Sequence, residues 1–206
     1  RFLAPLIAVA PNGGVLDGHQ QLRDRPMSEQ VEALRSLGAH LVSDEGHLPL
    51  RSDGGGVRGG GVQVNGATSS QFVSGLLLCG PLFDEGVDLE VMGSLVSRPY
   101  LDMTIAVMEA FGVPVEHDDQ RRFGCPHGVY ASQHHAIEPD ASAASYFFGL
   151  AAMTRGRIRV EGLGQGSIQG DMAFLGVLEA MGAGVRQGDD RTEGVGRDPH
   201  RVDVEL

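Results

Sequence analysis

Tryptophan is absent from this 206-residue sequence, aromatic residues make up only 5 %, and there are two cysteines. Two cysteines cannot build a disulfide framework, so a disulfide-stapled secreted domain is excluded and the reducing cytoplasm is the expected compartment. The chain also lacks an excess of basic residues, since 16 Lys and Arg against 27 Asp and Glu give a net charge of −11. A nucleic-acid partner is therefore not expected. No apolar run approaches the roughly 20 residues of a membrane span, so no membrane partner is expected either.

Glycine, in contrast, is abundant. There are 31 glycines in 206 residues, about twice the average usage of ~7 %. The hydrophobic content of 41 % is ordinary for a globular protein. The composition therefore predicts one or two globular domains that are rich in turns and close backbone approaches, without a large aromatic core.

Three segments share one pattern of apolar residues, at 31–41, 105–115 and 175–185. Their starting points are 74 and 70 residues apart, and apolar residues recur at every third or fourth place, which predicts an amphipathic helix. A glycine follows each apolar stripe, where a left-handed residue ends many helices; these are Gly38, Gly112 and Gly182. Each segment is therefore predicted to form a helix, a glycine turn and a strand.

A second repeat lies between these segments, where residues 69–78 match residues 143–152 at the same 74-residue offset. Both predict helices of small residues, followed by alternating strands at 86–91 and 156–160. The repeating unit is thus about 70 residues long, with two helices and several strands. Residues 1–6 match residues 71–76. We accordingly expect the chain to start inside a unit and to be a fragment of a longer protein, ending in a weak strand at 201–206.

The loop at residues 65–71, Asn-Gly-Ala-Thr-Ser-Ser-Gln, carries polar residues that the periodic pattern does not need. It follows an alternating strand at 61–64 and opens an apolar helix. Two hydroxyl groups, an amide and free backbone N–H groups at a helix N-terminus suit a phosphate or a carboxylate. The simpler alternative is a plain helix N-cap by Thr68 or Ser69.

Two Arg-Pro motifs open the helices of the first two amphipathic segments. Arg25 precedes Pro26, and Arg98 precedes Pro99. Proline near the first helical position explains the local structure by itself. A forked guanidinium at a helix entry could also hold an anion through two hydrogen bonds, although an exposed arginine at this position is often only solvated.

Other polar clusters favour structural roles. Asp140 opens the counterpart of the serine loop and predicts an N-cap, while Asp189 and Asp190 indicate a turn or a domain crossover. The glycine runs at 54–56 and 59–61 match neither a dinucleotide-binding nor a Walker pattern. The spacing of the set Cys125, His127, His134 and His135 matches no strong zinc pattern, so no metal is expected.

Four motifs together resemble the EPSP synthases, the enolpyruvyl transferases of the shikimate pathway. They are Leu-Arg-Asp-Arg-Pro-Met at 22–27, the strand at 59–64 leading into Ser-Ser-Gln-Phe-Val-Ser at 69–74, the segment 95–104 with Ser-Arg-Pro-Tyr, and Glu-Pro-Asp-Ala-Ser-Ala-Ala-Ser-Tyr at 138–146. The resemblance implies an α/β (α+β) fold of two lobes, each made of three βαβαββ units. Residues 1–188 would form most of the first lobe, about two of its units, and residues 189–206 would cross into the second.

The resemblance also implies site residues and ligands. Ser69, Ser70 and Ser97 would bind the phosphate of shikimate 3-phosphate, and Gln71 would contact substrate between the lobes. Arg25 would hold the carboxylate or phosphate of phosphoenolpyruvate, and Tyr100 would lie at the shikimate ring. The implied reaction transfers the enolpyruvyl group from phosphoenolpyruvate to shikimate 3-phosphate, a step of aromatic amino acid biosynthesis, with no cofactor.

Several family motifs have no counterpart in the sequence, among them the N-terminal Lys-Ser motif and the acidic and basic residues of the second lobe. The general acid and base groups are therefore expected outside this chain, with no catalytic residue inside it, and the second lobe is an expected partner. Two alternatives remain open. One is a UDP-N-acetylglucosamine enolpyruvyl transferase, which is disfavoured because that family is expected to lack Ser-Ser-Gln and to use a loop cysteine, whereas Cys79 lies in an apolar helix. The other is a non-catalytic anion-binding lobe.

Overall fold

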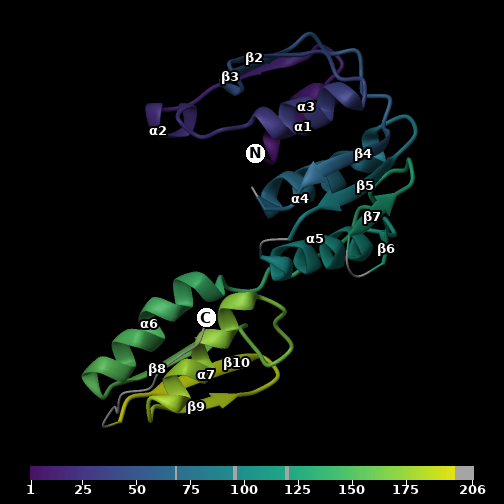
Figure 1. Cartoon of the computed structure of the whole chain (residues 1–206). Helices are drawn as coiled ribbons and strands as arrows, with labels where there is room; N and C mark the ends of the chain where they lie inside the picture. The colour runs from purple at the N-terminus through teal and green to yellow at the C-terminus, as the bar shows by residue number, and fades with distance from the viewer. Residues whose placement is uncertain (68, 95–96, 119–120, 198–206) are drawn as a thin grey trace. The chain divides into compact units, whose positions relative to one another are not determined.

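The chain forms two compact units, residues 1–133 and 134–206, in a computed structural model that describes all residues except 68, 95–96, 119–120 and 198–206 (Figure 1). The division between the units falls near residue 133, whereas the sequence placed a lobe boundary after residue 188. The assignment of 1–188 and 189–206 to two lobes stays a prediction. The expected strand at 201–206 lies outside the described residues.

Helices and strands alternate in the first unit, in the order α1 (Leu3–Val9), β1 (Gly14–Leu16), α2 (Gln20–Arg23), α3 (Ser28–Ser36), β2 (Leu41–Asp44), β3 (His47–Ser52), β4 (Gly60–Asn65), α4 (Ser70–Cys79), η1 (Gly80–Leu82), β5 (Val87–Met92), α5 (Arg98–Ala110), β6 (Glu116–His117) and β7 (Arg122–Cys125). The second unit contains α6 (Ala141–Thr154), β8 (Arg157–Glu161), η2 (Gly170–Met172), α7 (Ala173–Ala180), β9 (Gly184–Gln187) and β10 (Arg191–Val195).

The same topology occurs three times. Elements β4 to β7 follow the order βαβαββ and form a sheet with the strand order β4-β5-β7-β6, in which β4 and β5 are parallel and β7 is antiparallel to both of its neighbours. The sheets β1-β3-β2 and β8-β10-β9 repeat the order of its last three strands. The predicted α/β class and the repeated unit are confirmed.

The three predicted helix–glycine–strand segments are also present. Gly38, Gly112 and Gly182 have φ angles of 97°, 83° and 99°, and each follows a helix, namely α3, α5 and α7. The residue after each glycine donates its N–H to a carbonyl five residues earlier, as in Ala39 to Leu34 at 2.9 Å, which satisfies a carbonyl at the helix end. Strands β2 and β9 follow as expected, but after α5 the strand β6 begins only at Glu116. Residues 188–190 form the turn between β9 and β10, as the turn alternative for Asp189 and Asp190 predicted.

Helices α4 and α5 lie side by side on one face of the four-stranded sheet (Figure 1). In β5 the buried residues Val87, Leu89 and Val91 alternate with exposed residues, so one sheet face packs on the helices and the other meets solvent. Helix α4 is buried on nearly all sides because α1 packs against it as well. The first turn of α4 is thereby fixed in place.

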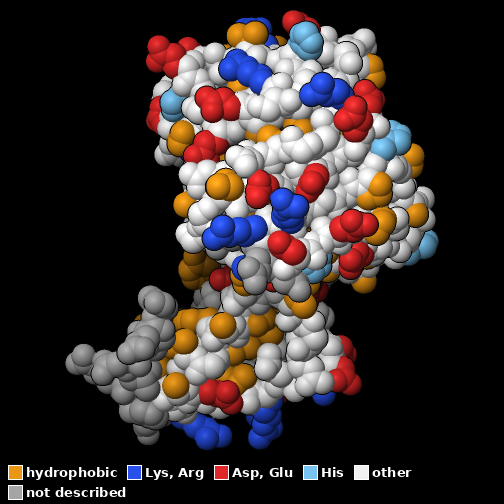
Figure 2. All heavy atoms as spheres, turned by 45° about the vertical axis from the view of Figure 1, so that its right-hand side comes forward, with side chains coloured by type: hydrophobic (Ala, Val, Ile, Leu, Met, Phe, Trp, Pro, Cys, Tyr) orange, Lys and Arg blue, Asp and Glu red, His pale blue; other side chains and the backbone are white. Residues whose placement is uncertain are grey.

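The second unit has its own core under α6. Asp140 accepts hydrogen bonds from Ser142 N and Ala143 N, which confirms the predicted N-cap. The outer side of α6 exposes Tyr146, Phe147, Leu150 and Met153, and hydrophobic side chains gather on this unit in Figure 2. The matching positions of α4, by contrast, are buried. Within the described residues, no helix is long and apolar enough to cross a membrane.

Burial controls the protonation of both thiols. Cys79 and Cys125 are free and buried, and desolvation raises the pKa of each to about 11. Burial also raises the pKa of Tyr130, whose hydroxyl donates to Leu78 O at 2.9 Å. This burial confirms the structural role predicted for Cys79.

The first unit is therefore expected to lose stability at alkaline pH. The thiols of Cys79 and Cys125 lose their protons near the ordinary pKa of 9.0 in the unfolded chain, whereas the native state still holds them at that pH. The free energy of unfolding is therefore unaffected by the thiols below pH 9.0 and falls as the pH rises toward 11. Urea unfolding between pH 7 and 10.5 measures the slope. A Cys79→Ala/Cys125→Ala variant should show a shallower decline, and an unchanged slope would contradict this origin.

Candidate functional site

The loop between β4 and α4 carries the predicted serines. Ser69 is the N-cap of α4, and its Oγ accepts from Gln71 N at 3.2 Å. Asn65 Oδ1 accepts from Ala67 N at 3.0 Å and so tightens the turn that leads into the cap. The N-cap expectation is confirmed for Ser69, while Thr68, the other candidate, lies outside the described residues.

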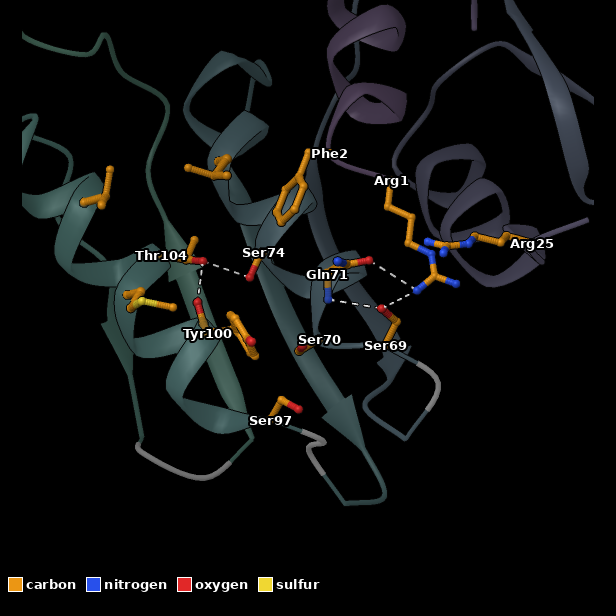
Figure 3. Close-up of a pocket in the computed structure, with 13 residues that line it drawn as sticks. Arg1, Phe2, Arg25, Ser69, Ser70, Gln71, Ser74, Ser97, Tyr100 and Thr104 are labelled. Atoms are coloured by element: carbon orange, nitrogen blue, oxygen red, sulfur yellow. Dashed lines mark hydrogen bonds between the residues drawn. The ribbon is translucent and has the colours of Figure 1, made fainter. Parts of the chain in front are cut away.

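Ser70, the first residue of α4, lies largely inside the protein. The residue is only 7 % exposed, and within the described parts of the chain its side chain forms no hydrogen bond. In Figure 3 its side chain lies between those of Ser69 and Tyr100. This arrangement leaves Ser70 available to a ligand.

Helix α5 supplies the opposite wall of the site. Ser97, its first flanking residue, adopts the left-handed conformation with φ 61° and ψ 56° and makes no capping hydrogen bond. A residue other than glycine adopts this conformation at an energetic cost, and such residues gather at functional sites. Thr104, one turn after Tyr100, forms a hydrogen bond of 2.8 Å between its Oγ1 and Ser74 Oγ of α4, which links the two walls.

Two arginines face this loop, and neither pairs with a carboxylate among the residues that the structure describes. Arg25 forms no ion pair with any residue in the described ranges, and Arg1 donates only to uncharged groups, Ser69 Oγ and Gln71 Oε1. Burial, and then the charge of Arg25, lowers the pKa of Arg1 below its usual value. Figure 3 shows both guanidinium groups beside Gln71. In a chain of net charge −11, such a pair marks a local positive potential.

The other arginine of the Arg-Pro motifs does not join them. Arg98 Nε lies 2.6 Å from Asp102 Oδ1, and its guanidinium lies over the Phe123 ring. Anion binding by Arg25 therefore stays a prediction, whereas a carboxylate one helical turn away already pairs with the Arg98 guanidinium.

All six predicted site residues line one cavity of about 720 Å³. The lining residues are Arg1, Phe2, Arg25, Ser69, Ser70, Gln71, Ser74, Leu78, Ser97, Tyr100, Met103, Thr104 and Val107. They include two guanidinium groups and several hydroxyl groups but no carboxylate, so the cavity suits an anionic ligand with a small apolar part. The structure brings the six residues together, and their contacts with ligands stay predictions.

Sequence reasoning missed Arg1, Ser74 and Thr104 as lining residues. Arg1 aligns with Gln71 in the internal repeat, and this was the one signal that could have pointed to it. Ser74 and Thr104 lie inside helices, where their hydroxyl groups carry no distinctive pattern.

Two members of the set Cys125, His127, His134 and His135 contact backbone carbonyl groups. Cys125 Sγ approaches Leu77 O at 3.7 Å, and His127 Nδ1 lies 2.8 Å from Phe83 O. No group of three or more His, Cys, Asp or Glu residues that could hold a metal ion occurs in the part of the chain that the structure describes.

Comparison with known proteins gives one consistent result. The sequence profile of the EPSP synthase (3-phosphoshikimate 1-carboxyvinyltransferase) family matches residues 1–206. The chain is 42 % identical to the 3-phosphoshikimate 1-carboxyvinyltransferase of Photorhabdus laumondii over 197 residues, covering 94 % of this chain and 46 % of that protein. It is 40 % identical to the one of Sodalis glossinidius over 210 residues, covering 100 % and 48 %. The chain thus spans about half the length of these curated relatives.

Solved structures support the fold. An EPSP synthase from Acinetobacter baumannii superposes with a TM-score of 0.69 over 95 % of this chain and 45 % of that chain, at 21 % identity. A second structure of the protein from the same organism gives a TM-score of 0.70. This likeness agrees with the α/β fold that the repeats predict.

Proposed function

Because the chain belongs to the EPSP synthase family, we propose that it supplies one wall of the substrate site of a 3-phosphoshikimate 1-carboxyvinyltransferase. In this role it binds shikimate 3-phosphate and phosphoenolpyruvate together with a second lobe, in the shikimate pathway that leads to the aromatic amino acids. The cytoplasm is the proposed compartment.

The proposal depends on one observation, the character of the cavity between α4, α5 and α1. The cavity gathers two guanidinium groups and the hydroxyl groups of four serines, and no carboxylate is among the described residues that line it, although acidic residues outnumber basic ones by 27 to 16 in the chain. Both proposed substrates are phosphorylated carboxylates, and charge-assisted hydrogen bonds to such groups are the strong ones.

Each predicted residue has a place in this assignment. Ser69, Ser70 and Ser97 donate to the phosphate of shikimate 3-phosphate, and the N-terminus of α4 adds its dipole. Tyr100 lies at the shikimate ring, and Gln71 contacts substrate where the second lobe closes. Arg25 holds the carboxylate or phosphate of phosphoenolpyruvate, because its guanidinium has no carboxylate partner among the described residues.

The proposed reaction needs groups that the cavity does not contain. The 5-hydroxyl group of shikimate 3-phosphate loses its proton to a base as its oxygen adds to C2 of phosphoenolpyruvate, while C3 gains a proton from an acid. The bond from C2 to the phosphate oxygen then breaks, C3 loses a proton, and inorganic phosphate leaves. Proton transfer needs an acid and a base within hydrogen-bond reach, and the residues that line the cavity include no carboxylate, histidine or lysine. We therefore assign binding to this chain and proton transfer to the second lobe.

Two measurements test the proposal together. Calorimetric titration of the 206-residue chain should detect shikimate 3-phosphate and give a much weaker signal with shikimate, which lacks the phosphate. Joined to the rest of a full-length family member, the chain should release phosphate from phosphoenolpyruvate only when shikimate 3-phosphate is present. Turnover with UDP-N-acetylglucosamine instead would overturn the assignment in favour of the related transferase.

A non-catalytic anion-binding lobe is the second candidate. The same absence of carboxylate, histidine and lysine from the cavity lining favours it. Binding of shikimate 3-phosphate by the chain, combined with no phosphate release by the joined protein, would support this candidate and exclude the transferase.

A further inference from the structure

The main chain of Arg1 is anchored before α1 begins. Its carbonyl oxygen accepts from Gln30 Nε2 at 3.0 Å, and Gln30 on α3 is completely buried. Gly75 of α4 makes room for this contact, since a Cβ there would lie 3.1 Å from Gln30 Nε2. The guanidinium of Arg1 lies 4.8 Å from the centre of the Phe72 ring, a favourable cation–π distance. The side chain therefore extends from a fixed point along a fixed path.

The end of this side chain meets two of the predicted ligand-binding groups. Arg1 Nη1 donates to Ser69 Oγ at 2.8 Å and to Gln71 Oε1 at 3.3 Å. Ser69 Oγ also accepts from Gln71 N at 3.2 Å. A hydroxyl group has two acceptor positions and one donor proton, so both acceptor positions of Ser69 are occupied.

The hydroxyl group of Ser69 can therefore interact with a ligand only by donating its proton. No described residue accepts it, and Ser69 lines the cavity. Likewise, the contact of Arg1 with Gln71 Oε1 leaves the Gln71 NH₂ group, a pure donor, without a protein partner in the described ranges. A hydroxyl group that could donate or accept is thus restricted to donation.

We propose that Arg1 is a positioning residue that forces Ser69 to donate its hydroxyl proton, and Gln71 its amide protons, to an anionic oxygen in the cavity. The inference rests on the proposed function for the identity of the ligand. It extends that function by adding Arg1, which acts by orienting Ser69 and Gln71. Arg1 makes the loop selective for acceptors, such as phosphate or carboxylate oxygens, over groups that donate.

Electrostatics fits the same role. Arg1 and Arg25 repel each other, and burial of Arg1 opposes its charge. An anion bound beside Ser69 offsets the repulsion between the two arginines and stabilises the partly buried charge of Arg1. Both effects favour ligand binding. The guanidinium group stays charged, because arginine is not deprotonated in proteins.

A double-substitution cycle tests the inference, with inorganic phosphate and shikimate 3-phosphate titrated separately into the 206-residue chain. Arg1→Gln should lower the affinity by about tenfold or more, the usual effect of losing a charge-assisted hydrogen bond. In a Ser69→Ala background the same substitution should cost clearly less than in the unsubstituted chain, because only the contact of Arg1 with Gln71 remains. Arg1→Lys, which keeps a charged donor, should recover most of the loss.

Arg23→Gln is the matched control, since it removes the same charge from an exposed arginine that pairs with Asp17 and does not line the cavity. It should change the affinity little. Equal losses for Arg1→Gln and Arg23→Gln, equal losses in both Ser69 backgrounds, or no recovery in Arg1→Lys would each overturn the inference.

The ligands separate this inference from the proposed function. If the cycle shows coupling with inorganic phosphate while shikimate 3-phosphate does not bind, the inference stands and the proposed function fails. If shikimate 3-phosphate binds equally well to the unsubstituted chain and to Arg1→Gln, the proposed function stands and the inference fails. If the unsubstituted chain binds neither ligand, both fail.

Discussion

Replacing Ser69 and Ser70 together with alanine is expected to weaken the binding of shikimate 3-phosphate by about 1–3 kcal/mol for each charge-assisted hydrogen bond that is lost. The effect is large because both residues are more than nine-tenths buried, so water does not easily replace the missing donors. Calorimetric titration measures the loss directly.

The single substitutions separate ligand binding from helix capping. Ser69→Ala also removes the N-cap of α4, which typically costs about 0.5–2 kcal/mol of stability. Ser70→Ala removes no protein hydrogen bond in the described part of the chain, so it should weaken the ligand and leave stability nearly unchanged. Ser36→Ala serves as a control, because this exposed serine on α3 bonds only to Glu32 O. Unchanged affinity in the double variant would reduce the loop to a plain helix cap.

The second large effect is expected at Gly86, in the turn before β5, where alanine should destabilise the first unit by about 3 kcal/mol or more. Gly86 has a φ of 68°, and a Cβ there would lie 2.3 Å from Cys125 O and 2.8 Å from His127 N. Both are backbone atoms, so the clash can be relieved only if the paired strands β5 and β7 move apart. Urea unfolding followed by circular dichroism measures the loss.

Gly55 provides the matched control. Its φ of 91° is similarly left-handed, but apart from its two chain neighbours no described residue has an atom within 4 Å of the position of a Cβ. Gly55→Ala should therefore cost only the conformational penalty of roughly 1–2 kcal/mol. The difference between the two variants isolates the steric clash at Gly86, and equal losses would show that the clash is relieved without moving the strands.

Periodicity was enough to predict most of the fold. The apolar spacing before Gly38, Gly112 and Gly182 predicted three helices with left-handed ends, and all three are present. The match between residues 69–78 and 143–152 predicted α4 and α6. These features depend on contacts between residues close in sequence, and local geometry alone decides them.

The division of the chain into compact units was less predictable. The two units separate near residue 133, and nothing in the local pattern marks that place, because the repeat continues on both sides of it. Packing around two separate apolar clusters determines the division. Helices α4 and α6 also share one sequence pattern, yet the positions that are buried in α4 are exposed at Tyr146 and Met153 in α6. The local pattern could not predict this difference.

Within the site, the sequence alone determined the residue types: a serine pair at a helix start, an arginine before a proline, and a tyrosine in the first turn of the next helix. Only the tertiary structure decided that Arg25 has no ion-pair partner among the described residues while Arg98 pairs with Asp102, and that Arg1 reaches Ser69 from 68 residues away. The physical reason is that a hydrogen bond depends on distance and direction in space. A motif sets which groups are available, whereas the packing of α1 against α4 sets which of them meet.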